Sequence, residues 1–352
     1  MRRFIKAFRA EIKRIARWRG YAAVVFVLPA VSLMFFCLYL FDNRIESLPI
    51  VIVDNDNSSL SRALIEMIDA TQSVEVCYKA ENTIEAEALM RQGKAYAIVV
   101  IPYDFERKIL RAEGANVALY NSGINISTAG FIAKDISTVI ATFGAGIELK
   151  RGKTISEIMP IRATDHNLFN PYINYGYYLA PCFMPMMIMI FTILATITAV
   201  THPKPRSRVE LLGRIAPTTI SMVAYSLVML VLLFRVIGVP LAGSSTIIVL
   251  STLLFIAVYQ AIAIFFVAIL KERHTALSLG GGFAVLSFTL SGLTFPTLAM
   301  YPIFKAASYL FPFTYYIEIM VDQALRGAPA EVSIPKVCIL SLFLLLPLCK
   351  RL

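Results

Sequence analysis

Long apolar stretches that carry almost no charge alternate with polar stretches along this chain. Each apolar stretch is close to the roughly 20 residues that a helix needs to cross a hydrocarbon core about 30 Å thick. The six predicted spans are residues 21–41, 177–201, 218–240, 245–270, 275–295 and 332–349. The pattern therefore predicts an α-helical polytopic membrane protein with six transmembrane helices.

The first 20 residues contain eight Lys or Arg residues and a single acid, Glu11, and apolar residues recur among them at helical spacing. This combination is typical of an amphipathic helix that lies on the inner surface of a membrane. A disordered basic tail is the alternative. We expect residues 1–20 to form a cytoplasmic amphipathic basic helix.

Hydrophobic residues make up 58% of the 352 residues and charged residues 16%, which excludes a soluble, disordered or fibrous chain. The net charge of +10 is unevenly distributed. Residues 42–170 hold 13 Lys or Arg and 17 Asp or Glu, so the excess positive charge lies beside the apolar stretches. Basic residues that flank spans stay on the cytoplasmic side. We therefore expect both termini in the cytoplasm, residues 42–170 outside it, and no nucleic-acid partner.

Residues 42–170 alternate between short β-branched runs and helical patterns. Strands are predicted at residues 48–53, 74–78, 95–101 and 117–120, and helices at residues 58–70, 83–92 and 102–110. Residues 124–149 form one further helical pattern, which we expect to be a stalk that leads back to the second span. The segment is thus predicted to be an extracytoplasmic α/β domain inserted between transmembrane helices 1 and 2.

Residues 296–327 are too apolar for an open loop, and Pro296, Pro302 and Pro312 interrupt them too often for one continuous span. Broken backbone at membrane depth has to be covered by protein, because unsatisfied amides in lipid are costly. Re-entrant helices before the last transmembrane helix are the preferred interpretation. The alternative is an aromatic hairpin that rests on the outer leaflet.

Three charged residues follow Pro312 at positions i, i+4 and i+8 of one helix face: Glu318, Asp322 and Arg326. A carboxylate that faces lipid costs at least about 2.5 kcal/mol, so these side chains are expected to face a cavity or one another. They are candidate residues of a polar cluster at the outer end of a transport path. An ion-pair ladder that only fixes the helix is an equal alternative.

The sequence contains no recognisable pattern for catalysis. Its nearest approach to a nucleotide-binding loop, Gly152-Lys153-Thr154, lacks the first glycine of the P-loop, because position 147 is Ile147. The three histidines are isolated, and no Cys or His pair has metal-ligand spacing. We therefore expect no enzyme activity and no cofactor in this chain.

Several stretches resemble the membrane subunits of ABC-2 type ABC exporters, the multidrug and drug-resistance efflux permease family. Residues 290–327 are similar to the family's pattern of Ser-Gly, an apolar-Pro step, a second Pro, and Leu-Phe-Pro-Phe-Thr-Tyr ending at Tyr315, followed by a short acidic helix. Residues 51–70, 93–105 and 117–125 are similar to the family's extracytoplasmic domain. The resemblance covers most of the chain in the right order, and it implies that the prolines, Tyr315 and the charged residues form an outer gate.

Residues 202–217 occupy the place of the cytoplasmic loop that docks into an ATPase subunit in such permeases. Four residues match the family's pattern: Glu210, Leu211, Leu212 and Pro217. Basic residues up to and including Arg208 stand where the family's loop begins with acidic residues, and the family's Gly-Thr step is absent. The resemblance implies that residues 208–215 form the coupling helix. A more acidic ATPase surface or an asymmetric pair of permeases would accommodate the difference. The alternative is a basic loop whose charges only fix the orientation of the chain in the membrane.

The resemblance implies a half-transporter of the bacterial inner membrane. Two permease chains, identical or different, would form the pathway, and separate ABC ATPase subunits with ATP-Mg would drive it. A periplasmic adaptor and membrane lipid are further expected partners. The cargo would be an amphipathic or lipid-like compound moved outward, which the Met-rich residues 183–189 suit, although they also suit plain packing. The competing class is an ATP-independent channel, or a membrane anchor that presents the exported domain to an envelope or secretion assembly.

Overall fold

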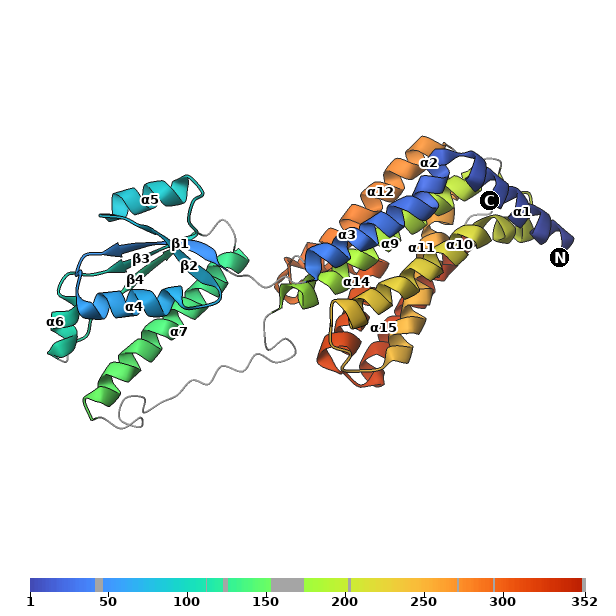
Figure 1. Ribbon diagram of the computed structural model, residues 1–352. Coiled ribbons are helices and arrows are strands. Elements are labelled where there is room, and N and C mark those ends of the chain that lie inside the picture. Colours follow the sequence, from blue (N-terminus) through green and yellow to red (C-terminus); the bar gives the residue numbers. More distant parts are fainter. Residues whose placement is uncertain are drawn as a thin grey trace. The chain divides into compact units, whose positions relative to one another are not determined.

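The computed structural model describes residues 1–41, 47–111, 113–122, 126–152, 174–201, 204–270, 272–293 and 295–349. The chain divides into two compact units (Figure 1). The helical unit comprises Met1–Asn43 and Asn167–Leu352, and the α/β unit comprises Arg44–His166. The α/β unit therefore interrupts the helical unit in sequence.

The α/β unit is built on a four-stranded sheet in the order β2-β1-β3-β4. Its strands are β1 (Leu48–Asp54), β2 (Val74–Lys79), β3 (Ala97–Ile101) and β4 (Ala118–Asn121). β1 pairs in parallel with β2 and β3, and β4 runs antiparallel to β3. Its helices are α4 (Ser59–Asp69), α5 (Thr83–Arg91), α6 (Phe105–Leu110) and α7 (Ile126–Lys150). The predicted strands and helices of this segment are thus confirmed, with ends that shift by a few residues.

Helices cover both faces of this sheet (Figure 1). Along β1, Ile50 and Ile52 point to the face that α4 and α7 cover, whereas Val51 and Val53 point to the face that α5 covers. Strands buried on both faces are apolar at nearly every position, which explains the β-branched runs in the sequence. The expected stalk, α7, packs its apolar residues into the core on the α4 side.

Asp56 fixes the start of α6 from outside that helix. Its two carboxylate oxygens accept hydrogen bonds from the backbone N–H groups of Phe105 (2.9 Å) and Glu106 (3.0 Å). Burial alone would raise the pKa of Asp56, but these bonds and one from the Ser58 side chain together lower it. The ionised form of Asp56 is therefore the one that stabilises the fold.

Replacing Asp56 with alanine should destabilise the α/β unit by about 1 kcal/mol, the usual cost of a lost helix cap. This stabilisation should be present above the ordinary pKa of an aspartate and should disappear as the pH falls through the lower pKa of Asp56 in the folded state. Thermal unfolding of the purified chain in neutral and acidic buffer, followed by circular dichroism, measures the effect. Asp56→Asn is the control that keeps part of the cap. Identical unfolding of all three proteins at neutral pH would contradict this role.

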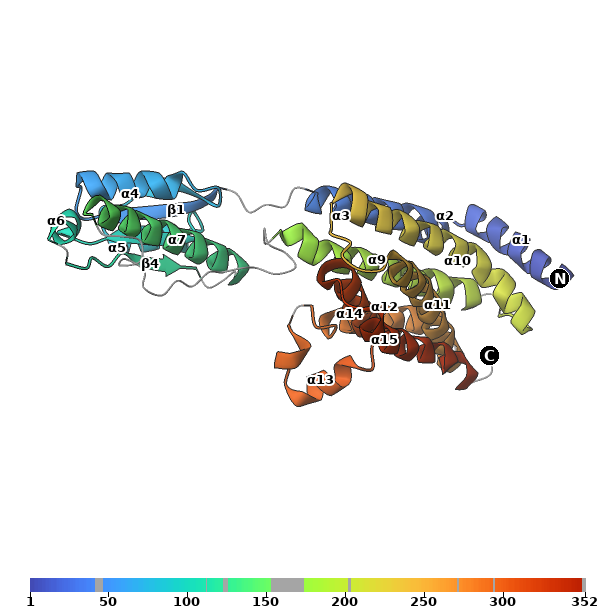
Figure 2. The ribbon, with the colours of Figure 1, turned by 90° about the horizontal axis from the view of Figure 1, so that it is seen from below.

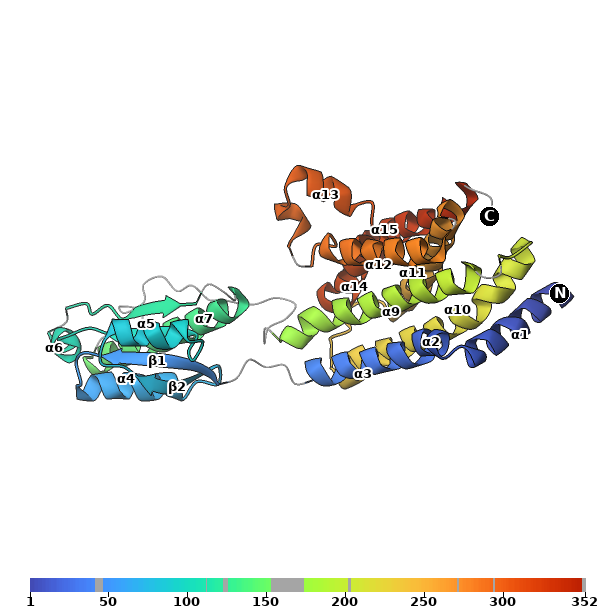
Figure 3. The ribbon, with the colours of Figure 1, turned by 90° about the horizontal axis from the view of Figure 1, so that it is seen from above.

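The helical unit begins with α1 (Arg2–Arg17), α2 (Arg19–Ala22), the π-helical turn η1 (Ala23–Val27) and α3 (Leu28–Leu40). After the α/β unit it continues with α9 (Tyr175–Thr201), α10 (Arg208–Val231), η2 (Leu232–Val236), α11 (Ser245–Ile269) and α12 (Arg273–Thr289). It ends with η3 (Thr297–Ala299), α13 (Pro302–Ser308), α14 (Pro312–Val321), η4 (Asp322–Arg326), α15 (Ala330–Leu342) and η5 (Phe343–Cys349). The helix α9 lies in the middle and packs against α3, α10, α11 and α12 (Figures 2 and 3).

Six described helices are long and apolar enough to cross a membrane: Arg19–Leu40, Thr128–Lys150, Gly176–Thr201, Arg208–Val236, Ser245–Ile269 and Ala330–Leu348. Five of them match predicted spans. The remaining predicted span, residues 275–295, is only partly helical, because α12 ends at Thr289 after 17 residues. Thr128–Lys150 qualifies by length and composition, but it belongs to α7, which packs on the sheet. The prediction and the described residues therefore both give six candidate spans. Residues 275–295 are a span only in the prediction, and Thr128–Lys150 qualifies only in the structure.

Residues 296–327, which three prolines were predicted to interrupt, do not form one continuous helix. Pro302 and Pro312 each occupy the first turn of a helix, where a missing N–H removes no intrahelical hydrogen bond. Pro296 directly precedes the single turn η3. Short helices therefore replace a continuous span, and their return to the outer face of a membrane stays a prediction.

Candidate functional site

The amphipathic helix α1 lies against the first turns of α10 (Figure 1). The two helices pack tightly at Gly213, where a Cβ atom would stand 2.7 Å from the Phe4 carbonyl oxygen and 2.9 Å from the Ala7 Cβ atom. Both distances are shorter than van der Waals contact, so only glycine fits at this crossing. The two segments that the charge pattern predicts to be cytoplasmic are thus packed together.

The start of α10 is fixed by its own side chains. The Ser207 hydroxyl oxygen accepts a hydrogen bond from the backbone N–H of Glu210 at 3.2 Å. The Glu210 carboxylate accepts one from the backbone N–H of Arg206 at 3.0 Å and forms an ion pair with Arg214 at 2.7 Å. This arrangement resembles a capping box, so Glu210 closes the first turn of α10 rather than projecting from it.

The other residues predicted to dock into an ATPase point in different directions. Arg208 is exposed, and Leu212 is 55% exposed, so both side chains are accessible to a partner. Leu211 instead packs against the apolar core of the helical unit, and Pro217 is buried. Of the predicted coupling residues, Arg208 and Leu212 are therefore the ones placed to contact a second protein.

The helix α10 continues past Pro217 to Val231 instead of ending near Ile215 as predicted. A proline inside a helix removes one backbone donor and often ends or bends the helix. Here the Thr218 and Thr219 hydroxyls both donate hydrogen bonds to the Ile215 carbonyl oxygen, at 2.7 and 2.8 Å, next to the proline. The predicted coupling residues are therefore the first turns of a candidate membrane helix and not a separate helix.

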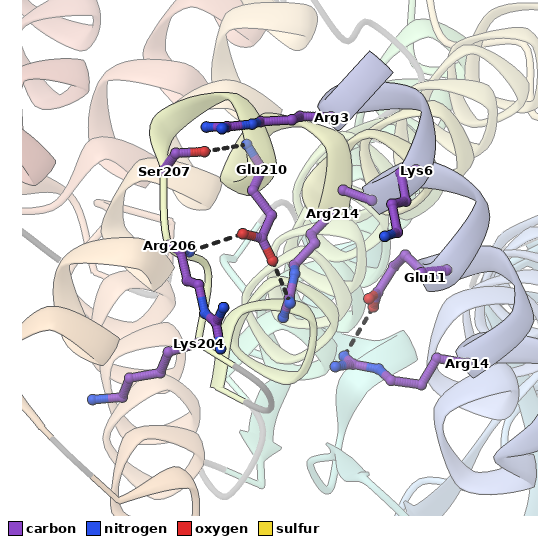
Figure 4. A pocket seen from close by; sticks show the side chains of 11 residues that line it. Arg3, Lys6, Glu11, Arg14, Lys204, Arg206, Ser207, Glu210 and Arg214 are labelled. Atoms are coloured by element: carbon purple, nitrogen blue, oxygen red, sulfur yellow. Dashed lines mark hydrogen bonds and ion pairs between the residues drawn. The ribbon is translucent and has the colours of Figure 1, made fainter. Parts of the chain in front are cut away.

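A cleft of about 670 Å³ lies between α1, the first turns of α10 and the loop before α10 (Figure 4). We name it the α1–α10 cleft. Its charged side chains are six basic and two acidic ones: Arg3, Lys6, Arg14, Lys204, Arg206, Arg214, Glu11 and Glu210. Both acids form ion pairs within the cleft, Glu11 with Arg14 at 2.8 Å and Glu210 with Arg214. The cleft is therefore strongly positive.

Buried polar contacts tie the cleft to the rest of the helical unit. The Glu11 carboxylate accepts a hydrogen bond from the Tyr21 hydroxyl at 2.8 Å, and Arg14 donates one to the Thr198 carbonyl oxygen near the end of α9. Burial raises the pKa of Glu11, although Arg14 and Tyr21 oppose the rise. These contacts connect α1 to both α2 and α9.

Trp18 lies between α1 and α2 and makes a further connection. The guanidinium carbon of Arg273, at the start of α12, is 4.2 Å from the centre of the Trp18 ring, which is a cation–π contact. Trp18 is the only tryptophan of the chain. Its fluorescence therefore reports on the junction of α1, α2 and α12 without labelling.

Asp322 is the centre of a second charged cluster, which joins α14 and η4 to α15. Its buried carboxylate forms ion pairs with Arg326 at 3.0 Å and with Lys336 at 2.5 Å. Lys336 also pairs with Glu318 at 3.2 Å. The sequence predicts that Glu318, Asp322 and Arg326 share a helix face, and the structure shows that Lys336 bridges two of them from a neighbouring helix.

Lys336 is not among the predicted site residues, although its signal is present in the sequence. It is a lone cation inside the apolar stretch 332–349, where a cation needs a carboxylate partner. Spacing does not identify that partner, because Asp322 lies on a different helix. Tyr315, which the sequence places with the cluster, donates its hydroxyl hydrogen bond to the Tyr309 carbonyl oxygen at 3.0 Å.

Gln323 ties the loop between α10 and α11 to η4 and α15. Its side-chain oxygen accepts a hydrogen bond from the Ser244 backbone N–H at 2.8 Å. Its side-chain nitrogen donates to the Ala328 carbonyl oxygen at 3.0 Å and to the Ser333 hydroxyl at 2.9 Å. Gly243 lies so close that a Cβ atom there would stand 2.6 Å from the Gln323 side-chain oxygen. One buried amide therefore joins the distant loop before α11 to two neighbouring segments, at Ala328 and Ser333.

The α1–α10 cleft and the Asp322 cluster are both built from ion pairs and hydrogen bonds that connect helices. Within the described ranges, no three His, Cys, Asp or Glu side chains converge as the ligands of a metal ion would. The acidic side chains of both clusters are engaged in ion pairs with Arg or Lys. The arrangement suits the binding of anions in the α1–α10 cleft and the transmission of movement between helices.

Comparison with known proteins places this arrangement in a family. The family described as ABC-2 family transporter protein matches residues 19–349, which is nearly the whole chain. The chain belongs to the ABC-2 transporter family. It is therefore a transporter permease that is embedded in a membrane by its apolar helices.

Two curated relatives are similar to this ABC-2 permease. Both are described as a probable multidrug ABC transporter permease YbhS, one from Escherichia coli strain K12 and the other from Escherichia coli O157:H7. Each is 24% identical over 294 residues, which is 79% of this chain and 74% of the relative. No solved structure matches. The family resemblance that the sequence indicates is thus confirmed.

Proposed function

We propose that this ABC-2 permease is the membrane-spanning half of an ATP-driven exporter in a bacterial inner membrane. A separate ABC ATPase subunit supplies the energy, and two permease chains form the pathway. The termini lie in the cytoplasm and the α/β unit lies outside it, where it meets the cargo or a periplasmic adaptor. The positive charge beside the candidate spans supports this orientation.

The contact between α1 and the first turns of α10 carries this proposal. Arg208 and Leu212 are four residues apart, so a charged and an apolar side chain are exposed on one face of α10. An ATPase that pushes on this face displaces α1 and α10 together, because the crossing at Gly213 has no free space. The contacts of Arg14 and Trp18 then pass the displacement to α9 and α12.

The outer gate, in this proposal, is formed by the short helices α13 and α14 with the Asp322 cluster beside them. The prolines Pro296, Pro302 and Pro312 allow these helices to be short, and Glu318, Arg326 and Tyr315 lie on or next to α14. The cargo moves outward past them.

The cargo is proposed to be amphipathic or lipid-like. The description of the relatives as probable multidrug permeases supports this class. The Met-rich residues 183–189 do not, because Met184 and Met189 are fully buried in the core of the helical unit and Met186 and Met187 pack against it. They are packing residues rather than the lining of a pathway.

Replacing Leu212 with glutamate should uncouple the permease from its ATPase without unfolding it. A charge at an apolar contact in a protein interface commonly costs more than about 1 kcal/mol, so we expect permease-stimulated ATP hydrolysis to fall at least about fivefold. The measurement is ATP hydrolysis by the co-purified complex in lipid vesicles. Leu110→Glu is the matched control, because Leu110 is an exposed leucine of the α/β unit.

Two outcomes would contradict the proposed function. One is ATP hydrolysis by the purified permease alone, and the other is an unchanged hydrolysis rate in the Leu212→Glu complex. If the chain purified only as a solitary oligomer that conducts ions across a planar bilayer, the channel alternative would replace the exporter.

A further inference from the structure

The α1–α10 cleft holds more positive charge than its carboxylates neutralise. Both acids are paired with arginines of the cleft. The four remaining cations are Arg3, Lys6, Lys204 and Arg206, and none of them forms an ion pair with a carboxylate among the described residues. They come from α1 and from the loop before α10, and they line one space (Figure 4). Like charges that share a confined space repel one another, so an anion bound between them would stabilise the cleft.

A second groove on α1 repeats this composition. It has a volume of about 440 Å³, and it shares Lys6 with the α1–α10 cleft. Its other basic residues are Arg2, Arg9 and Lys13, and none of the described side chains that line it is acidic. The helix α1 therefore presents cations on two sides, which is typical of a helix at an anionic membrane surface.

The exposed apolar side chains of α1 lie outside the cleft, about half a turn of the helix away from the residues that line it. On α1, Ile5 is 40% exposed and Ile12 is 45% exposed. The candidate span that includes α2 begins at Arg19, separated from α1 by Trp18 alone. The Arg14 end of the cleft thus lies within two helical turns of a candidate span, and Arg3 lies at the far end of α1.

We propose that the α1–α10 cleft binds the headgroup phosphate of an anionic phospholipid. Arg3, Lys6, Lys204 and Arg206 supply the positive charge, and the two arginines can each donate a pair of parallel hydrogen bonds to phosphate oxygens. A bound lipid then connects α1 to the loop before α10 and strengthens the contact between them.

A phospholipid accounts for these observations better than an acidic protein surface does. The exposed pair proposed to contact the ATPase, Arg208 and Leu212, is not among the side chains that line the cleft. The lining residues form a concave space of about 670 Å³, and the basic residues of both grooves suit a negatively charged membrane surface. Binding of the lipid is a property of the permease alone, so it can be measured whether or not the proposed export function is right.

Titration of the purified full chain with phosphatidylglycerol in neutral detergent micelles, followed by native mass spectrometry, tests the proposal. The double variant Arg3→Gln with Lys204→Gln removes two charges from the cleft. The control variant, Arg9→Gln with Lys13→Gln, removes two charges from α1 outside the cleft. Nonspecific attraction between basic residues and an anionic surface contributes about 1 kcal/mol per residue. If this attraction were the only cause of binding, both variants would lose the same amount of affinity for the lipid. We expect the cleft variant to bind phosphatidylglycerol about tenfold more weakly than the control variant.

Trp18 fluorescence and gel filtration that match the unchanged chain establish that both variants are folded. Equal weakening in the two variants, or equal affinity of the unchanged chain for phosphatidylglycerol and phosphatidylcholine, would overturn the proposal. Displacement of the lipid by millimolar inorganic phosphate would show a site for soluble anions and would also overturn it. Unchanged lipid binding in the cleft variant, together with loss of the co-purified ATPase, would assign the cleft to a partner protein instead.

Discussion

Asp322→Asn should destabilise the helical unit by about 3 kcal/mol, the usual cost of removing one partner from a buried ion pair. The Asp322 side chain is only 2% exposed, and it is the closest partner of both Arg326 and Lys336. Without this charge, Lys336 keeps only the longer contact with Glu318 at 3.2 Å. Thermal unfolding of the purified permease in detergent, followed by gel filtration of the surviving protein, measures the loss.

Two further variants show whether the loss comes from the unpaired cation. Asp322→Asn combined with Lys336→Met should be more stable than Asp322→Asn alone, because it removes the ammonium group together with its carboxylate partner. Glu318→Gln is the matched control: its side chain is 34% exposed, so its ion pair should contribute less than about 1 kcal/mol. Equal stability of Asp322→Asn and Glu318→Gln would contradict the central position of Asp322.

Gly213→Ala should move α1 away from α10 and weaken coupling. The new Cβ atom would stand 2.7 Å from the backbone oxygen of Phe4, which cannot move without the whole of α1. Overpacking of this kind costs about 1–3 kcal/mol. We expect a lower unfolding temperature, stronger quenching of Trp18 fluorescence by acrylamide, and reduced ATP hydrolysis by the complex.

Gly281→Ala is the control for this substitution. Gly281 also lies in a helix of the same unit, α12, but a Cβ atom there would meet nothing within 4 Å. Alanine favours a helix over glycine by about 1 kcal/mol, so this variant should be as stable as the unchanged chain or more so. If Gly213→Ala behaved in the same way as Gly281→Ala, the tight crossing of α1 and α10 would not exist in solution.

The elements of the α/β unit could be predicted from the sequence because each has a local signal. The strand β1 is a compact β-branched run, and α4 begins directly after its cap Ser58. Gly93, which follows α5, adopts a positive φ of 72°, as expected for a helix stop. Apolar pattern alone does not distinguish a helix that packs on a sheet from one that spans a membrane, and α7 illustrates this ambiguity.

The candidate site could be predicted only in part, because much of it depends on contacts between distant segments. The pairing of Glu210 with Arg214 and of Asp322 with Arg326 follows from the i, i+4 spacing. The crossing of α1 and α10 at Gly213 does not, since no local pattern shows which helix lies opposite a glycine. Pro217 also misleads, because a proline in the sequence indicates a helix break where the structure has none.

The uninterrupted course of α10 has a mechanical consequence. At about 1.5 Å per residue, its 24 residues make a rod about 36 Å long, with Leu212 near one end. The loop beyond its other end is tied by Ser244 to the Gln323 amide. If α10 pivots within the bundle, a tilt imposed at its first turn moves its other end in the opposite direction, so in the proposed orientation the same movement would close the cytoplasmic side of the bundle and loosen the outer side.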